Sequence, residues 1–167
     1  MDRVFLETKF ATDDSGEISG LAWPFGSPDR MGDVIEKGAF RKVKFPLPIL
    51  FAHHQRDPIG IWTEGQEKSN GYYLKGRLLV DDVTRAREVR ALIKAQAIRG
   101  MSIGFRTKKW DRGSDGTRII KDLELLEASI VAIPMHPGAR VTSAKTAVQA
   151  IALAAALNRA TAHFAKR

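Results

Sequence analysis

The chain has 167 residues, enough for one domain with a buried core. Its 44% hydrophobic and 28% charged residues are typical of a folded protein, and the lack of cysteine excludes disulfides, thiolate metal sites and a cysteine nucleophile. The formal charge of +8 favours contact with polyanions, but no zinc finger, ribonucleoprotein motif or arginine-rich block with aromatics is present, so we expect no dedicated nucleic-acid binding. No signal peptide and no apolar run near ~20 residues is found, which predicts a cytoplasmic protein without a membrane span.

The first half of the chain predicts β-strands. Short runs rich in β-branched and aromatic residues alternate with Gly, Pro, Asp and Asn. These runs cover residues 4–6, 18–22, 48–52, 59–62 and 72–80. In the last run Tyr72, Leu74, Leu78 and Val80 share one face, and the opposite face is charged. We therefore expect an antiparallel sheet or barrel with one wet face.

A helix follows at residues 83–97, where apolar residues recur at helical spacing. Asp81 or Asp82 is placed to cap its start and Gly100 to stop it. Strands are predicted again at 101–107, 118–123 and 126–133, with a turn at 111–116 and with Pro134 and Pro137 ending the last strand.

The chain becomes rich in alanine from about Ser143, which predicts a C-terminal helix with basic residues at its end. We expect one domain over residues 1–142 and a separate tail over 143–167. The basic tail is interpreted either as a docking or self-cleaved segment or as a solvated helix end.

Three places concentrate reactive side chains. The first is the apolar run that ends in His53 and His54, just before a turn at Asp57 and Pro58. Histidine at the end of a buried strand has a fixed position and a pKa near neutral, which suits a general base. An ordinary surface or hydrogen-bonded histidine is the simpler interpretation.

The second place is Ser102, flanked by Gly100 and Gly104 in a G-x-S-x-G pattern. This pattern marks the nucleophile elbow of α/β-hydrolases, where a strand precedes the serine and a helix follows it. Here the predicted order is reversed, and too little chain follows for the acid, the histidine and a large parallel sheet. The alternative is a small residue at a tight helix-to-strand junction between permissive glycines.

The third place is the predicted strand that carries Glu127 and Ser129. Alternation places Glu127, Ser129 and Val131 on one face and residues 126, 128 and 130 on the other. A carboxylate on such an apolar strand needs a partner. An Arg or Lys would make it structural, and an imidazole would make it functional.

Taken in order, these segments resemble the prohead protease family of tailed bacteriophages and gene transfer agents. The matching pieces lie at residues 20–22, 33–35, 38–40, 48–53, 58–60, 71–78, 100–105, 126–131 and 134. The resemblance implies an α+β, mainly β fold: an antiparallel β-barrel surrounded by helices, similar to herpesvirus assemblin. It also implies His53 as base and Ser102 as nucleophile. Glu127 takes the position where assemblin has a second histidine, with Ser129 as the fallback.

The same resemblance implies a serine endopeptidase that needs no cofactor or metal and cleaves the scaffold-like arm of the major capsid precursor, and itself, inside the immature procapsid. Candidates for oxyanion support are the side chain of Arg140 and backbone N–H groups, either near Ser102, such as that of Ile103, or in residues 134–140. A contact with the portal and a homodimer are further expectations from the resemblance. The competing hypotheses are a non-catalytic capsid-assembly or scaffolding protein with the same fold, and a basic nucleic-acid-binding module.

Overall fold

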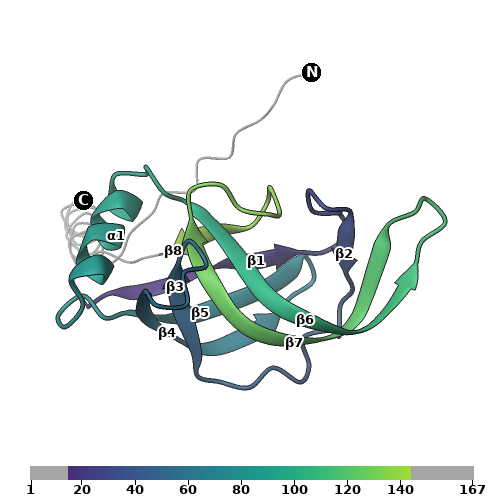
Figure 1. The fold of residues 1–167 in the computed structure, drawn as a ribbon, viewed down its shortest axis with the longest axis horizontal. Coiled ribbons are helices and arrows are strands. Elements are labelled where there is room, and N and C mark those ends of the chain that lie inside the picture. The colour runs from purple at the N-terminus through teal and green to yellow at the C-terminus, as the bar shows by residue number, and fades with distance from the viewer. Residues whose placement is uncertain (1–14, 144–167) are drawn as a thin grey trace, which may run out of the picture.

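The computed structural model describes residues 15–143, which form one mainly β domain (Figure 1). The predicted strand at 4–6, the predicted C-terminal helix and the proposed tail lie outside the described residues. The strands, in chain order, are β1 (Glu17–Pro24), β2 (Asp33–Ile35), β3 (Leu47–Phe51), β4 (Pro58–Glu67), β5 (Gly71–Leu78), β6 (Gly100–Arg112), β7 (Arg118–Val131) and β8 (Arg140–Ser143), with helix α1 (Thr84–Lys94) between β5 and β6.

Seven of these strands close into a barrel. The ring runs β7-β3-β4-β5-β1-β8-β6, and β6 pairs again with β7, while β2 adds to β7 from outside the ring. Most neighbours are antiparallel, but β7 pairs in parallel with both β2 and β3. β1 lies beside β8, so the first and last described strands are neighbours. The predicted β-barrel is confirmed.

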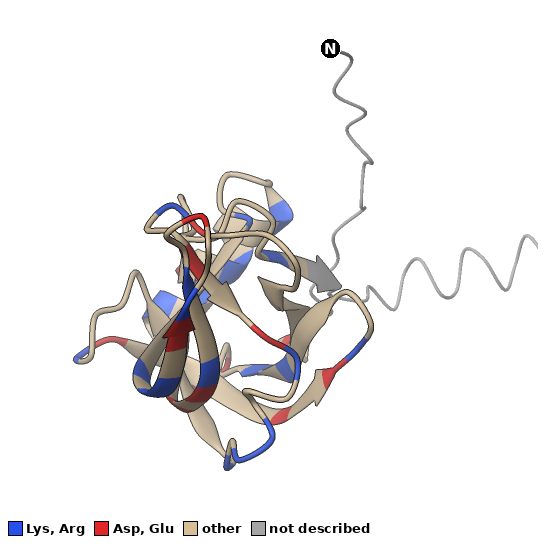
Figure 2. Cartoon of the chain, turned by 90° about the vertical axis from the view of Figure 1, so that its right-hand side faces the viewer, with Lys and Arg blue, Asp and Glu red and all other residues tan. Residues whose placement is uncertain are grey.

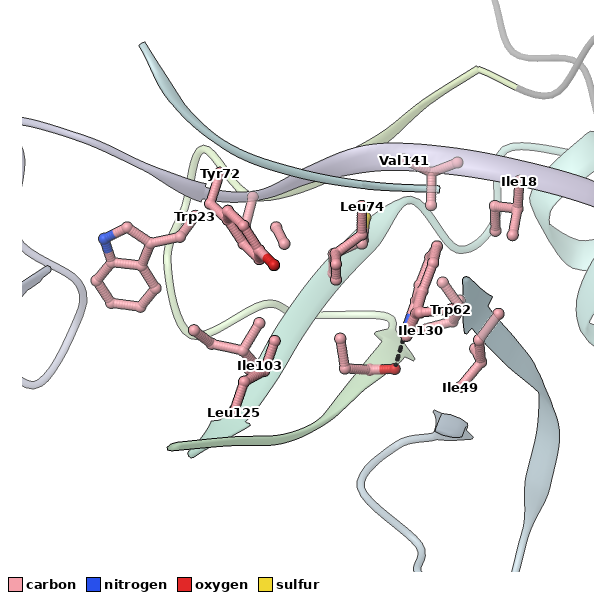
Figure 3. Close-up of a cluster of buried hydrophobic side chains, with 14 of the residues drawn as sticks. Ile18, Trp23, Ile49, Trp62, Tyr72, Leu74, Ile103, Leu125, Ile130 and Val141 are labelled. Atoms are coloured by element: carbon pink, nitrogen blue, oxygen red, sulfur yellow. Dashed lines mark hydrogen bonds between the residues drawn. The ribbon is translucent and has the colours of Figure 1, made fainter. Parts of the chain in front are cut away.

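Alternating side chains fill the barrel and explain why these segments are strands. In β5, Tyr72, Leu74 and Leu78 are buried and the charged residues between them point outward, as predicted. Trp62 is fully buried, and its indole Nε1–H donates to the Ala128 carbonyl across 2.9 Å (Figure 3). This contact ties β4 to β7 inside the core.

Helix α1 is amphipathic, with Ala86, Val89 and Ile93 buried. The predicted capping residues are wrong, because Val83 is the N-cap and makes no side-chain cap bond. The helix also ends at Lys94, before Gly100, and Gln96 adopts the positive φ of 60° that follows it. The expectation of a barrel surrounded by helices is overstated, because α1 is the only α-helix within residues 15–143 and packs at one end of the barrel (Figure 1).

The region predicted as two strands at 118–123 and 126–133 is a single strand, β7. A β-bulge explains the difference: Gly104 pairs with Glu127 and Phe105 pairs with Leu125, so Leu126 has no partner on β6. Leu125 is therefore buried and Leu126 is 45% exposed, whereas simple alternation places Leu126 on the buried face. The bulge therefore shifts the alternation of buried and outward-facing side chains on β7 by one residue, just before Glu127.

Beyond the bulge, β6 and β7 continue as a long hairpin with charges of both signs (Figure 2). Lys108 pairs with Glu124, and Lys121 pairs with Asp111. The basic residues of this arm are thus partly matched by acids. No helix among the described residues is long and apolar enough to cross a membrane.

Candidate active site

His53 lies in a tight turn at the end of β3. Ala52 and His53 both have positive φ, 50° and 61°, and the N–H of His54 donates to the Phe51 carbonyl across 3.0 Å. Two central residues with positive φ are the mark of a type I′ turn, which normally prefers Asn and Gly. A strained turn made of Ala and His is the kind of outlier that points to function.

β7 holds this turn in place through two hydrogen bonds. The Ala52 N–H donates to the Ile130 carbonyl across 3.0 Å, and the His53 N–H donates to Oγ of Ser129 across 3.1 Å. The backbone of His53 is thus fixed by the strand that carries Glu127.

Glu127 and Ser129 face outward because the bulge at Leu126 shifts the alternation. Without the extra residue, both would share a face with the buried Leu125. With it, Ala128 and Ile130 fill the core, and the carboxylate and the hydroxyl meet the turn. The bulge is therefore what presents the acid to His53.

The carboxylate of Glu127 uses both oxygens. Oε1 lies 2.7 Å from Nδ1 of His53, and Oε2 accepts a 2.6 Å hydrogen bond from Oγ of Ser129. A carboxylate can only accept, so Nδ1 of His53 carries a proton and Nε2 of the neutral ring has the free lone pair. The hydrogen bond to Glu127 is the main cause that raises the pKa of His53 above its ordinary value, against an opposite effect of partial burial.

Ser102 lies across the ladder from Ser129. Directly opposite residues of an antiparallel pair project to the same face, so the two serines share the outer face with Glu127. Ser102 is 5% exposed, and its hydroxyl makes no hydrogen bond with His53 or any other described residue. The structure thus joins His53, Glu127 and Ser129 directly and places Ser102 beside them.

Close packing explains the two glycines that flank Ser102. Neither Gly100 nor Gly104 has a positive φ, so neither is needed for a left-handed conformation. A Cβ at Gly100 would lie 2.7 Å from both the Val131 carbonyl oxygen and Cδ of Pro134. A Cβ at Gly104 would overlap the carboxylate of Glu127. The motif sits in a β-strand, in contrast to a nucleophile elbow.

The two candidates for oxyanion support lie on either side of Ser102. Ile103 is the next residue of β6, with its side chain in the core. Arg140 opens β8 and pairs with Gly100, which places it on the same face as Ser102. Arg140 is exposed, whereas Ile103 contributes only its backbone to that face.

Sequence reasoning missed the bulge at Leu126, the link from Ser129 to the His53 backbone and the contact of Gly104 with Glu127. The second glycine of the motif was the available signal for the last of these, since a strand glycine often marks a close approach. Within residues 15–143, no three His, Asp or Glu side chains gather where they could hold a metal ion.

Comparisons with known proteins show which proteins this chain resembles. The model of the family described as Caudovirus prohead serine protease matches residues 5–153. The capsid polyprotein of Pseudomonas phage PAJU2 is 37% identical over 149 residues, which cover 84% of this chain and 22% of the relative. The prohead protease of Escherichia phage T5 is 33% identical over 72% of this chain and 59% of its own length. For the prohead protease of Enterobacteria phage HK97 the values are 30%, 84% and 65%.

The chain thus spans between about a fifth and two thirds of the length of these relatives. Among solved structures, the bacteriophage T4 capsid assembly protease matches with a TM-score of 0.53 at 19% identity, over 69% of this chain and 80% of that one. A KSHV protease matches with a TM-score of 0.52 at 16% identity, over 75% and 63%. These likenesses confirm the herpesvirus-protease-like fold.

Proposed function

We propose that this chain, which belongs to the Caudovirus prohead serine protease family, is a serine endopeptidase that cleaves capsid and scaffold precursors during prohead maturation. The observation that carries the proposal is the hydrogen bond between Nδ1 of His53 and Glu127, formed on the face where Ser102 lies. It fixes the imidazole in the tautomer that a general base requires.

In the proposed mechanism Oγ of Ser102 attacks the peptide carbonyl while Nε2 of His53 takes the hydroxyl proton. Glu127 stabilises the imidazolium that forms. The imidazolium then gives its proton to the leaving amine, which departs and leaves an acyl-enzyme. Water attacks this ester with His53 again as base, and the acid product and the Ser102 hydroxyl are released. The hydrogen bond between Ser102 and His53 forms on substrate binding, as catalytic contacts often do.

The oxyanion of the tetrahedral intermediate needs hydrogen-bond donors on the same face as the Ser102 hydroxyl. The backbone N–H groups around Ile103 and the guanidinium of Arg140 are the nearest candidates along β6 and β8. Arg140 is supported by its shared face with Ser102. It would contribute a positive charge and several N–H donors to this face.

The names of the relatives support the proposed substrates and partners. Capsid polyprotein and prohead protease name proteins of capsid assembly, which supports the arm of the major capsid precursor as substrate. We include self-cleavage, a site of action inside the procapsid in the host cytoplasm, contact with the portal, and dimerisation in the proposal, as the family resemblance implies. No cofactor is required by the mechanism.

A fluorophosphonate probe tests the nucleophile without knowledge of the cleavage site. Labelling of the wild-type protein should map to Ser102 and vanish in Ser102→Ala. His53→Ala should slow labelling and precursor cleavage by about 10³-fold or more. His54→Ala is the matched control, because the His54 side chain is exposed and makes no hydrogen bond with a described residue. It should retain both activities.

Undiminished labelling or cleavage in Ser102→Ala would overturn the assignment. A wild-type protein that assembles with the capsid precursor but neither labels nor cleaves would instead favour the non-catalytic assembly protein.

A further inference from the structure

We propose that Gly104 is a positioning residue, whose missing side chain leaves a slot on β6 in which the Glu127 carboxylate lies and reaches His53. The inference deepens the proposed function and rests on it for the role of the carboxylate in catalysis. The contacts that define the slot stand on geometry alone.

The slot follows from the pairing of the two strands. Gly104 is the ladder partner of Glu127, at the bulge where β7 gains one residue. A Cβ atom at position 104 would lie 3.0 Å from Cδ and 3.1 Å from Cγ of Glu127, and closer still to Oε1. The Glu127 carboxylate therefore lies close to the backbone of β6, in space that a side chain at position 104 would enter.

Oε1, the Glu127 oxygen nearest to Gly104, is also the oxygen that contacts the His53 imidazole. Oε1 is bound to Nδ1 of His53 at 2.7 Å, whereas Oε2 is bound to Ser129 at 2.6 Å. A methyl group at position 104 therefore pushes on the oxygen that orients His53. Because Ser129 holds the other oxygen, the carboxylate has little freedom to retreat without losing one of its two partners.

Gly100 provides a contrast on the same strand. A Cβ there would meet the Val131 carbonyl oxygen and the ring of Pro134, each at 2.7 Å. Backbone and a proline ring cannot move aside, whereas the end of a glutamate side chain can. We therefore expect alanine at 100 to act on stability and alanine at 104 to act on the site.

The test is the pKa of His53, measured by NMR titration of its imidazole in the full chain. The hydrogen bond to Glu127 raises this pKa, so Gly104→Ala should lower it toward the ordinary value of 6.5. Cleavage should fall about tenfold or more. In a Glu127→Ala background the clash is gone, so adding Gly104→Ala should change neither the pKa nor the residual activity. Gly100→Ala should lower the melting temperature and leave the His53 pKa in place.

An unchanged His53 pKa in a folded Gly104→Ala protein would overturn the inference. Should Gly104→Ala fail to fold, the double variant decides: recovery of folding with Glu127→Ala supports the slot, and failure of both contradicts it. The NMR result does not depend on catalysis. A lowered pKa in a protein whose wild type shows no peptidase activity would leave the slot intact and defeat only the proposed function.

Discussion

Ser102 and Ser129 face each other across the β6–β7 ladder, and substitution by alanine should affect a different property at each position. Ser129 is fully buried and makes two hydrogen bonds, one to Glu127 and one from the His53 N–H. Ser102 is nearly as buried but makes no hydrogen bond with a described residue. We expect Ser129→Ala to cost mainly stability and Ser102→Ala to cost only activity.

The size of the first effect follows from the groups left without a partner. Ser129→Ala removes the acceptor of the His53 N–H and the donor to one Glu127 oxygen, at about 1–3 kcal/mol for each group. A loss of about 2–4 kcal/mol in the free energy of unfolding is therefore expected, and part of it is recovered where water enters. Ser102→Ala should stay within about 1 kcal/mol of wild type, because the Ser102 hydroxyl makes no hydrogen bond with a described residue that the substitution would break.

Urea unfolding followed by tryptophan fluorescence measures both free energies, and fluorophosphonate labelling measures the activity. Ser129→Cys keeps a similar volume with a weaker donor, so its stability should fall between those of serine and alanine. Equal losses for Ser102→Ala and Ser129→Ala, or a Ser129→Ala loss below about 1 kcal/mol, would refute the assignment of the two hydroxyls.

Three further predictions concern other parts of the barrel. Ala52→Gly should raise the free energy of unfolding by up to about 1 kcal/mol in urea, because glycine relieves the positive φ; a loss would contradict this. Burial lowers the pKa of His136, whose Nδ1 accepts a hydrogen bond from the Gly138 N–H. Below about pH 6.5 the unfolded chain therefore binds a proton that the folded chain does not, so the free energy of unfolding should fall as the pH drops. His136→Gln should flatten that fall, and an identical pH profile would refute it. Trp62→Phe should cost about 2 kcal/mol in urea through the lost bond to Ala128, and no loss would count against it.

The sequence predicts six of the seven barrel strands because alternation is a local property, but it does not predict the short β8. The pattern around Tyr72 and Leu74 predicts both the strand and its buried face, since every second residue in it is apolar. The predicted N-cap of the helix is wrong. Asp81 and Asp82 are residue types that favour helix caps, but both lie in a turn before the helix, and Val83 is the N-cap.

The site is predicted less completely, because its geometry depends on pairing between distant strands. Alternation correctly joins Glu127 to Ser129, but nothing local shows that Leu126 has no partner on β6. The role of His53 also depends on a positive φ, and Ala52 and His53 are residues that rarely signal such a turn. The G-x-S-x-G pattern indicates a special backbone, but its glycines serve contacts with β7 and Pro134.

The position of β8 between β1 and β6 determines how far a peptide that follows β8 lies from Ser102. Ser143 lies beside Ser19, and β8 runs back about 10 Å to Arg140, the partner of Gly100. A peptide joined after Ser143 would need at least about five extended residues to cover this distance and the two further residues from Gly100 to Ser102. Under the proposed self-cleavage, a peptide that reaches the hydroxyl of its own molecule would be released in a unimolecular reaction, with a half-life that stays the same when the protein is diluted.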